Sequence, residues 1–77
     1  MKTFNTDSFI LATFLLSEGL SMIGQNTTNP RRIVFVFEES SKREELTNKF
    51  LSHKARIEPH VFFSAMKDVK QIIHQIK

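Results

Sequence analysis

The side chains able to bind a metal or move a proton are few and scattered in this chain. Fourteen residues separate His60 from His74, which is about 21 Å along a helix axis, so these two histidines cannot share a metal ion. His53 and His60 could approach one another across a loop, but two histidines without a third ligand make a weak site. Because the chain has no cysteine, thiolate ligands and a cysteine nucleophile are excluded. The sequence therefore predicts no metal site and no cofactor.

Nucleophilic catalysis has one superficial candidate. Ser64 follows His60 by one helical turn, as a nucleophile beside a general base would. No third group is placed to orient the histidine, and no glycine-rich elbow carries the serine. The two glycines, Gly19 and Gly24, cannot build a phosphate-cradling loop. We therefore do not expect an enzyme, and no small-molecule substrate is evident.

Basic side chains give a clearer indication of a ligand. The net charge is +3, and residues 53–77 carry five basic residues against two acidic ones. Three lysines follow helical spacing away from an apolar stripe, and an arginine pair marks the end of an expected hairpin, an arrangement that can hold phosphates. An ordinary solvated face is the alternative, because the chain has no Tyr or Trp for base stacking. The predicted nucleic-acid contacts are Arg31, Arg32, Lys67, Lys70 and Lys77.

The first half of the chain predicts one helix and a hairpin. Thr6 is the expected N-cap of a helix that contains the apolar run Phe9–Leu16, and Gly19 fits the left-handed position that follows a helix. Strands are expected over Leu20–Gln25 and Arg31–Glu38, joined by the turn-forming residues 26–30. Residues Lys2–Asn5 could add a third strand.

Two helices follow the hairpin. Ser41 and Glu44 form a capping box that begins the second helix, which should end near Ala55. The third helix begins at Pro59 with Glu58 as its cap and continues to the C-terminus. Its apolar residues recur at steps of three and four: Phe62, Ala65, Met66, Val69, Ile72, Ile73 and Ile76.

These elements predict a single α+β domain over residues 1–77, an antiparallel β-hairpin packed on three helices in the order α-β-β-α-α. A chain of 77 residues has room for one core. Its composition, 40% hydrophobic and 25% charged, is that of a globular protein.

The strand over Ile33–Phe37 is apolar on both faces. A strand with one face in water should alternate apolar and polar residues, so the second face needs a cover. The predicted protein interface consists of Val34, Val36, Met22 and Ile23. The alternative is that the first helix lies across this face and seals it.

The sequence also resembles a family of small uncharacterised domains from bacteria, archaea and phages that have no assigned activity. The resemblance covers nearly the whole chain and implies this order of elements and a phage or mobile-element setting, but it transfers no site residue. The resembling segments are Phe4-Asn5-Thr6-Asp7, Leu11-Ala12, Leu15-Leu16 with Gly19, Arg32–Glu38, and Pro59 with Phe62, Ala65 and Lys67.

We expect a non-enzymatic binding module, a homo-oligomer or part of a larger complex, that binds nucleic acid weakly and without sequence preference. The alternative is a protein–protein interaction or assembly subunit, an adaptor or inhibitor, with no nucleic-acid role. The absence of cysteine favours a reducing compartment. The longest apolar run, Phe9–Leu16, is far shorter than the roughly 20 residues that span a bilayer. We therefore expect a cytoplasmic protein without membrane contact.

Overall fold

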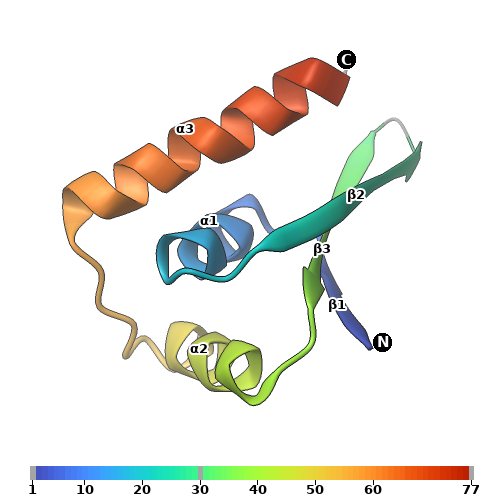
Figure 1. The fold of residues 1–77 in the computed structure, drawn as a ribbon. Helices are drawn as coiled ribbons and strands as arrows, with labels where there is room; N and C mark the ends of the chain where they lie inside the picture. The colour runs from blue at the N-terminus through green and yellow to red at the C-terminus, as the bar shows by residue number, and fades with distance from the viewer. Residues whose placement is uncertain (1, 30, 77) are drawn as a thin grey trace.

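Three strands and three helices make up the described part of the chain, residues 2–29 and 31–76 of a computed structural model (Figure 1). The predicted α+β class is confirmed. The predicted order is wrong at its start, because a strand precedes the first helix: the possible third strand at Lys2–Asn5 forms over Thr3–Thr6. In chain order the elements are β1 (Thr3–Thr6), α1 (Phe9–Ser17), β2 (Met22–Asn29), β3 (Arg32–Glu38), α2 (Ser41–Leu51) and α3 (Pro59–Ile76).

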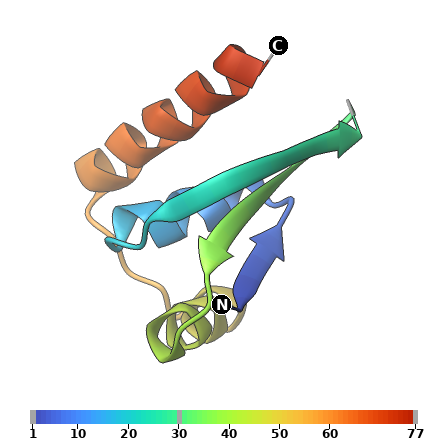
Figure 2. The ribbon, with the colours of Figure 1, turned by 45° about the vertical axis from the view of Figure 1, so that its right-hand side comes forward.

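The sheet has the order β1-β3-β2, and both pairs are antiparallel. The central strand β3 is the segment predicted over Arg31–Glu38, one residue shorter at its start. Because side chains alternate along a strand, Phe35 and Phe37 share one face, and only 2% and 0% of their surfaces are exposed. All three helices lie on one side of the sheet in both views (Figures 1 and 2), so this buried face is the one they cover.

Strand β2 is longer than predicted. Of residues 26–30, which were expected to form a turn, residues 26–29 instead belong to β2, with Asn26 opposite Val34 and Asn29 opposite Arg32. Pro30 lies outside the described residues. Backbone pairing with β3 outweighs the turn preference of these polar side chains, because the ladder needs only N–H and C=O groups. The pairing shifts register twice, between Met22 and Gly24 and between Asn26 and Asn29.

Helix α1 begins and ends with defined caps. Its N-cap is Ser8, whose hydroxyl accepts a hydrogen bond from the Leu11 amide at 3.1 Å. The predicted cap, Thr6, is wrong because that residue pairs with β3 as the last residue of β1. The predicted ending is confirmed: Gly19 has φ +94°, and the Leu20 amide donates to the Leu15 carbonyl at 3.1 Å.

Helix α1 is the centre of the core. Its five residues Leu11–Leu15 are all buried, because the helix packs against α3 and α2 as well as facing the sheet. Thr13 is buried without cost to its hydroxyl, which donates to the Phe9 carbonyl at 2.8 Å. The core also includes Leu46 from α2 and Val69 from α3, at 6% and 0% exposed surface. An apolar helix whose middle residues are covered by the sheet, α2 and α3 therefore holds the domain together.

Helix α2 (Ser41–Leu51) starts at Ser41, but its N-cap lies one residue before the cap of the predicted capping box. Ser40 is the N-cap and accepts from the Arg43 amide at 3.0 Å, so Ser41 is the first helical residue. The helix ends at Leu51 and not near Ala55, because His53 takes a left-handed conformation with φ +62° that stops it.

Helix α3 begins at Pro59, as predicted. Its predicted cap is also confirmed, since the Glu58 carboxylate accepts from the Val61 amide at 2.9 Å. Within the apolar stripe, Ala65 and Val69 are buried, and Phe62 and Ile73 pack against the core at partial exposure. No helix in the described part of the chain is long and apolar enough to cross a membrane.

Candidate functional site

The end of the β2–β3 hairpin, residues 25–32, projects from the body of the domain (Figures 1 and 2). Strand β1 pairs with β3 only from Glu38 back to Phe35, so residues 32–34 of β3 pair with β2 alone. Every described residue of 25–32 is exposed. None of these residues is acidic, and two are arginines. We call this segment the hairpin arm; it is a polar, two-stranded ribbon with a positive end.

Two asparagines shape the hairpin arm. The Oδ1 atom of Asn26 accepts from the Thr28 amide at 3.0 Å, and Oδ1 of Asn29 accepts from the Arg31 amide at 2.9 Å. Bonds of this kind mimic a backbone turn and fix the local path of the chain. They also occupy the acceptor end of both amide groups, so the Nδ2 donors are the ends left for a ligand.

Arg31 and Arg32 differ in their surroundings. The Nε atom of Arg32 lies 2.7 Å from Oδ2 of Asp7, and these side chains are 64% and 49% exposed. An ion pair this exposed contributes at most about 1 kcal/mol, so a phosphate could displace the carboxylate. Arg31 is exposed, and no salt bridge joins it to an acid among residues 2–29 and 31–76.

The predicted lysines lie on α3, separate from the arm. Lys67 and Lys70 are exposed, and the Lys67 ammonium lies 4.8 Å from the ring centroid of Phe63, which is itself 52% exposed. Lys77 lies outside the described residues. The fold thus brings the C-terminal end of α3 to the same end of the molecule as the hairpin arm in both views (Figures 1 and 2).

The second face of the sheet, which carries Val34 and Val36, is not covered by a helix. Both valines are half-buried, with Asn26 beside Val34 and Asn5 beside Val36 on the neighbouring strands. The alternative in which α1 seals this face is wrong, because α1 packs on the Phe35 side. Polar neighbours on both flanks leave the apolar surface narrow.

The other two predicted interface residues are separated by the register shift in β2. Met22 stands opposite Phe37 and packs against the core. Its assignment to the second face is therefore wrong. Ile23 is the additional residue at the shift and is 47% exposed. Neighbouring strand residues point to opposite faces, so the pairing register, which the sequence does not show, decides that Met22 is the one that faces the core.

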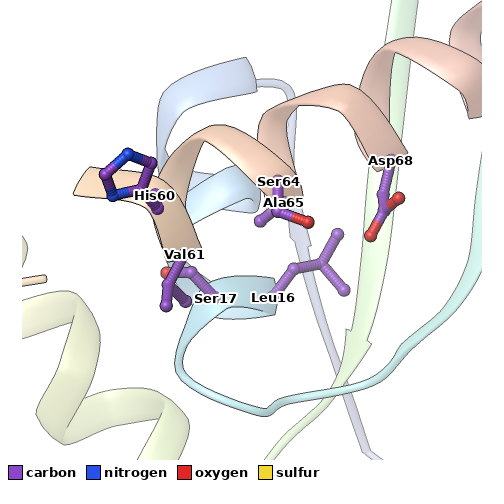
Figure 3. Close-up of a pocket in the computed structure, with 7 residues that line it drawn as sticks. All are labelled: Leu16, Ser17, His60, Val61, Ser64, Ala65 and Asp68. Atoms are coloured by element: carbon purple, nitrogen blue, oxygen red, sulfur yellow. The ribbon is translucent and has the colours of Figure 1, made fainter. Parts of the chain in front are cut away.

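An open groove of about 420 Å³ lies between the end of α1 and the start of α3 (Figure 3). His60 and Asp68 lie at its two ends with Ser64 between them (Figure 3), as positions one and two turns apart on a helix require. Among the described residues, no hydrogen bond joins Ser64 to His60, and no group of three histidine or acidic side chains could hold a metal ion. The residues lining the groove are Leu16, Ser17, His60, Val61, Ser64, Ala65 and Asp68.

The histidine at the groove does have a third group beside it, contrary to the sequence analysis. The Nδ1 atom of His60 lies 2.9 Å from Oε1 of Glu58. The hydrogen bond to His60 is the main reason that the pKa of Glu58 lies below its ordinary value, and the bond from the Val61 amide acts in the same direction. Because the His60 side chain is 95% exposed, this pair is a helix cap in water and not a shielded catalytic dyad.

Comparison with protein families gives one match. A family described as a domain of unknown function (DUF5659) matches residues 1–75. The chain belongs to the DUF5659 family. The match spans all six elements apart from the last residue of α3, and it confirms the resemblance to a family of small uncharacterised domains. No curated protein and no solved structure matches the chain.

Sequence reasoning missed the one buried cation within the described part of this DUF5659 domain. Arg43 is 8% exposed; its guanidinium donates two hydrogen bonds to Glu39, both at 2.7 Å, and lies 3.9 Å from the ring centroid of Phe4. A third bond reaches the Thr47 hydroxyl at 3.1 Å. The spacing of Glu39, Arg43 and Thr47, four residues at each step, was the available signal. Arg43 ties β1 to α2 and is therefore a structural cation, unlike Arg31.

Proposed function

We propose that this DUF5659 domain is a non-enzymatic module that binds nucleic acid through the hairpin arm. The observation that carries the proposal is the arm itself: an exposed, acid-free ribbon with Arg31 and Arg32 at its end. A protein that only needed to close a hairpin would not require two adjacent cations there. Phosphate contacts supply most of the sequence-independent affinity for nucleic acid.

The lysines of α3 extend this surface. Lys67 and Lys70 are exposed on α3. The C-terminal end of this helix lies at the same end of the molecule as the arm (Figure 1). Asp68 lies between them in sequence, but it lines the groove on the α1 side (Figure 3). A nucleic-acid backbone that crosses both the arm and the middle of α3 would meet cations on each.

Fluorescence anisotropy with labelled duplex DNA, single-stranded DNA and RNA, at salt concentrations from about 50 to 200 mM, tests the proposal. The wild type should bind, and its affinity should fall steeply with salt. Each lost phosphate contact removes about 0.9 from the slope of log affinity against log salt for duplex DNA. The variant Arg31→Ala/Arg32→Ala should therefore reduce the magnitude of that slope by about 0.9 for each of the two arginines that contacts a phosphate, and by at most about 1.8.

The matched control is Lys42→Ala/Lys49→Ala, which removes the same charge from exposed positions on α2, on the far side of the domain from the arm. It should leave the slope nearly unchanged. Equal losses in the two variants would mean that net charge alone drives binding. No binding of the wild type to any probe at micromolar concentration would refute the proposed function.

The uncovered second face favours a further protein contact, and we propose that a second copy of the chain occupies it. The half-buried Val34 and Val36 offer a small apolar surface, suited to a self-complementary contact. Analytical ultracentrifugation should show a dimer that Val34→Lys/Val36→Lys converts to a folded monomer. A wild type that stays monomeric would exclude this contact.

A further inference from the structure

We infer that the hairpin arm enters the major groove of duplex DNA and contacts base edges there. This inference rests on the proposed function and narrows it to one nucleic acid and one groove. It goes beyond phosphate binding, because the arm carries amide, hydroxyl and guanidinium groups together, and these are the side chains that read bases.

The dimensions of the arm fit the groove. The major groove of B-DNA is about 12 Å wide and 8.5 Å deep, and it admits a two-stranded ribbon. Paired strands lie about 5 Å apart. Two paired positions belong to the part that only β2 and β3 form: Val34 opposite Asn26, and Arg32 opposite Asn29. They are two residues apart along β3, so the ribbon extends by roughly 7 Å from the first pair to the second, where the turn begins. The part that only β2 and β3 form is thus about as long as the groove is deep.

The chemistry of the tip favours guanine. The five N–H groups of Arg31 are all donors, and within the described part of the arm no hydrogen bond occupies the Nδ2 donors of Asn26 and Asn29, whose Oδ1 atoms are already bonded. Guanine presents two acceptors, N7 and O6, on its major-groove edge, whereas adenine presents one acceptor and one donor. A tip rich in donors therefore matches guanine better than adenine.

Arg31 and Arg32 have separate roles in this geometry. Arg31 lies at the turn, at the extreme end of the ribbon, and its amide is held by Asn29. Arg32 lies one row back, where it pairs with Asp7 near the body of the domain. A ribbon inserted end-on brings Arg31 nearest to the bases, whereas the Arg32 side chain is directed back toward Asp7 and so toward the phosphates at the rim.

Duplex RNA should be a poor ligand for the same ribbon. Its major groove is deep and too narrow for side chains to read. Binding to the two duplexes of equal sequence and charge therefore separates groove entry from simple phosphate attraction.

The experiment compares three probes of one guanine-containing sequence: a DNA duplex, the RNA duplex, and a DNA duplex with 7-deazaguanine in place of guanine. We expect the DNA duplex to bind at least about tenfold more tightly than either of the other two, within the range of discrimination that a bidentate base contact provides. The variant Arg31→Lys keeps the charge but loses the two-pronged guanidinium, so it should lose most of the preference for guanine over 7-deazaguanine. The control Arg32→Lys should keep that preference.

Equal affinity for the DNA and RNA duplexes, or no effect of 7-deazaguanine, would overturn the groove inference and leave the proposed function standing. A preference that Arg31→Lys does not reduce would overturn the role of Arg31 in base reading. Failure of all three probes to bind would refute the proposed function and this inference together.

Discussion

The packing of α3 against the core can be tested with one pair of identical substitutions. Val69 and Val61 lie on the same helix, but Val69 is fully buried whereas Val61 is 45% exposed. Replacing either with alanine removes the same two carbon atoms. Only at Val69 do those atoms leave a cavity in the core, so the difference between the variants measures burial and not helix propensity.

The expected loss at Val69 follows from its burial. Two methylene equivalents are worth about 1.6 kcal/mol of transfer free energy, and the cavity left behind raises the total to about 2 kcal/mol. A small domain of this kind has roughly 3–5 kcal/mol of unfolding free energy from its core. Val69→Ala should therefore remove about half of it, whereas Val61→Ala should change it by less than about 0.5 kcal/mol.

Urea unfolding followed by far-ultraviolet circular dichroism is the suitable assay, because the chain has no Trp or Tyr to report by fluorescence. With a denaturant slope of about 1 kcal/mol per molar, the midpoint for Val69→Ala should fall by about 2 M. Equal midpoints for the two variants would refute the placement of α3. An altered slope would instead show that the unfolded state had changed.

Three further substitutions test local features. His53→Gly should stabilise the domain by roughly 0.5–1 kcal/mol, because glycine adopts the left-handed conformation at the end of α2 without a Cβ penalty; a lower melting temperature would contradict the turn at φ +62°. Ser40→Ala should cost about 1 kcal/mol and Ser41→Ala much less, and the reverse order in thermal melts would place the cap at Ser41. Hydrogen bonds from Arg43 hold the pKa of Glu39 below its ordinary value of 4.5, so the stability that this pair contributes is present above that value and is lost as the pH falls through the lowered pKa. Melting temperatures of Glu39→Gln should accordingly change less on acidification below pH 4.5 than those of the wild type; parallel curves would argue against the pair.

The best-predicted elements were those in which a single periodicity dominates. The run Ile33–Phe37 allowed only a strand, and the stripe of α3 allowed only a helix with Ala65 and Val69 inward. The position of a helix cap was ambiguous where two residues able to cap stand next to each other. Two adjacent serines, Ser40 and Ser41, shifted the start of α2 by one residue, because either hydroxyl can cap a helix.

Features that depend on distant partners were the ones that sequence could not supply. Asn26 and Asn29 are residue types that favour turns, but both pair with β3 as part of strand β2. Met22 and Ile23 were both offered for the second face, and the pairing of β2 with β3, which no local signal shows, puts Met22 on the core side. For the candidate site, the arginine pair was placed at the hairpin end from its sequence alone, but the projection of the arm beyond β1 required the register of all three strands.

The place of β3 in the sheet has a consequence for how the chain acquires its structure. The central strand is the last of the three to be synthesised, and the pair Thr3–Glu38 closes a loop of more than thirty residues. At about 5–20 residues per second, the apolar helix α1 waits several seconds on the ribosome before α3 exists to cover it. A fragment that ends before α3 lacks Val69 and leaves one side of α1 uncovered, and a fragment that begins after α1 lacks four of the eight residues of the core cluster. Folding should therefore be a single cooperative event after the last helix emerges, and until then the exposed face of α1 is a natural client for a chaperone.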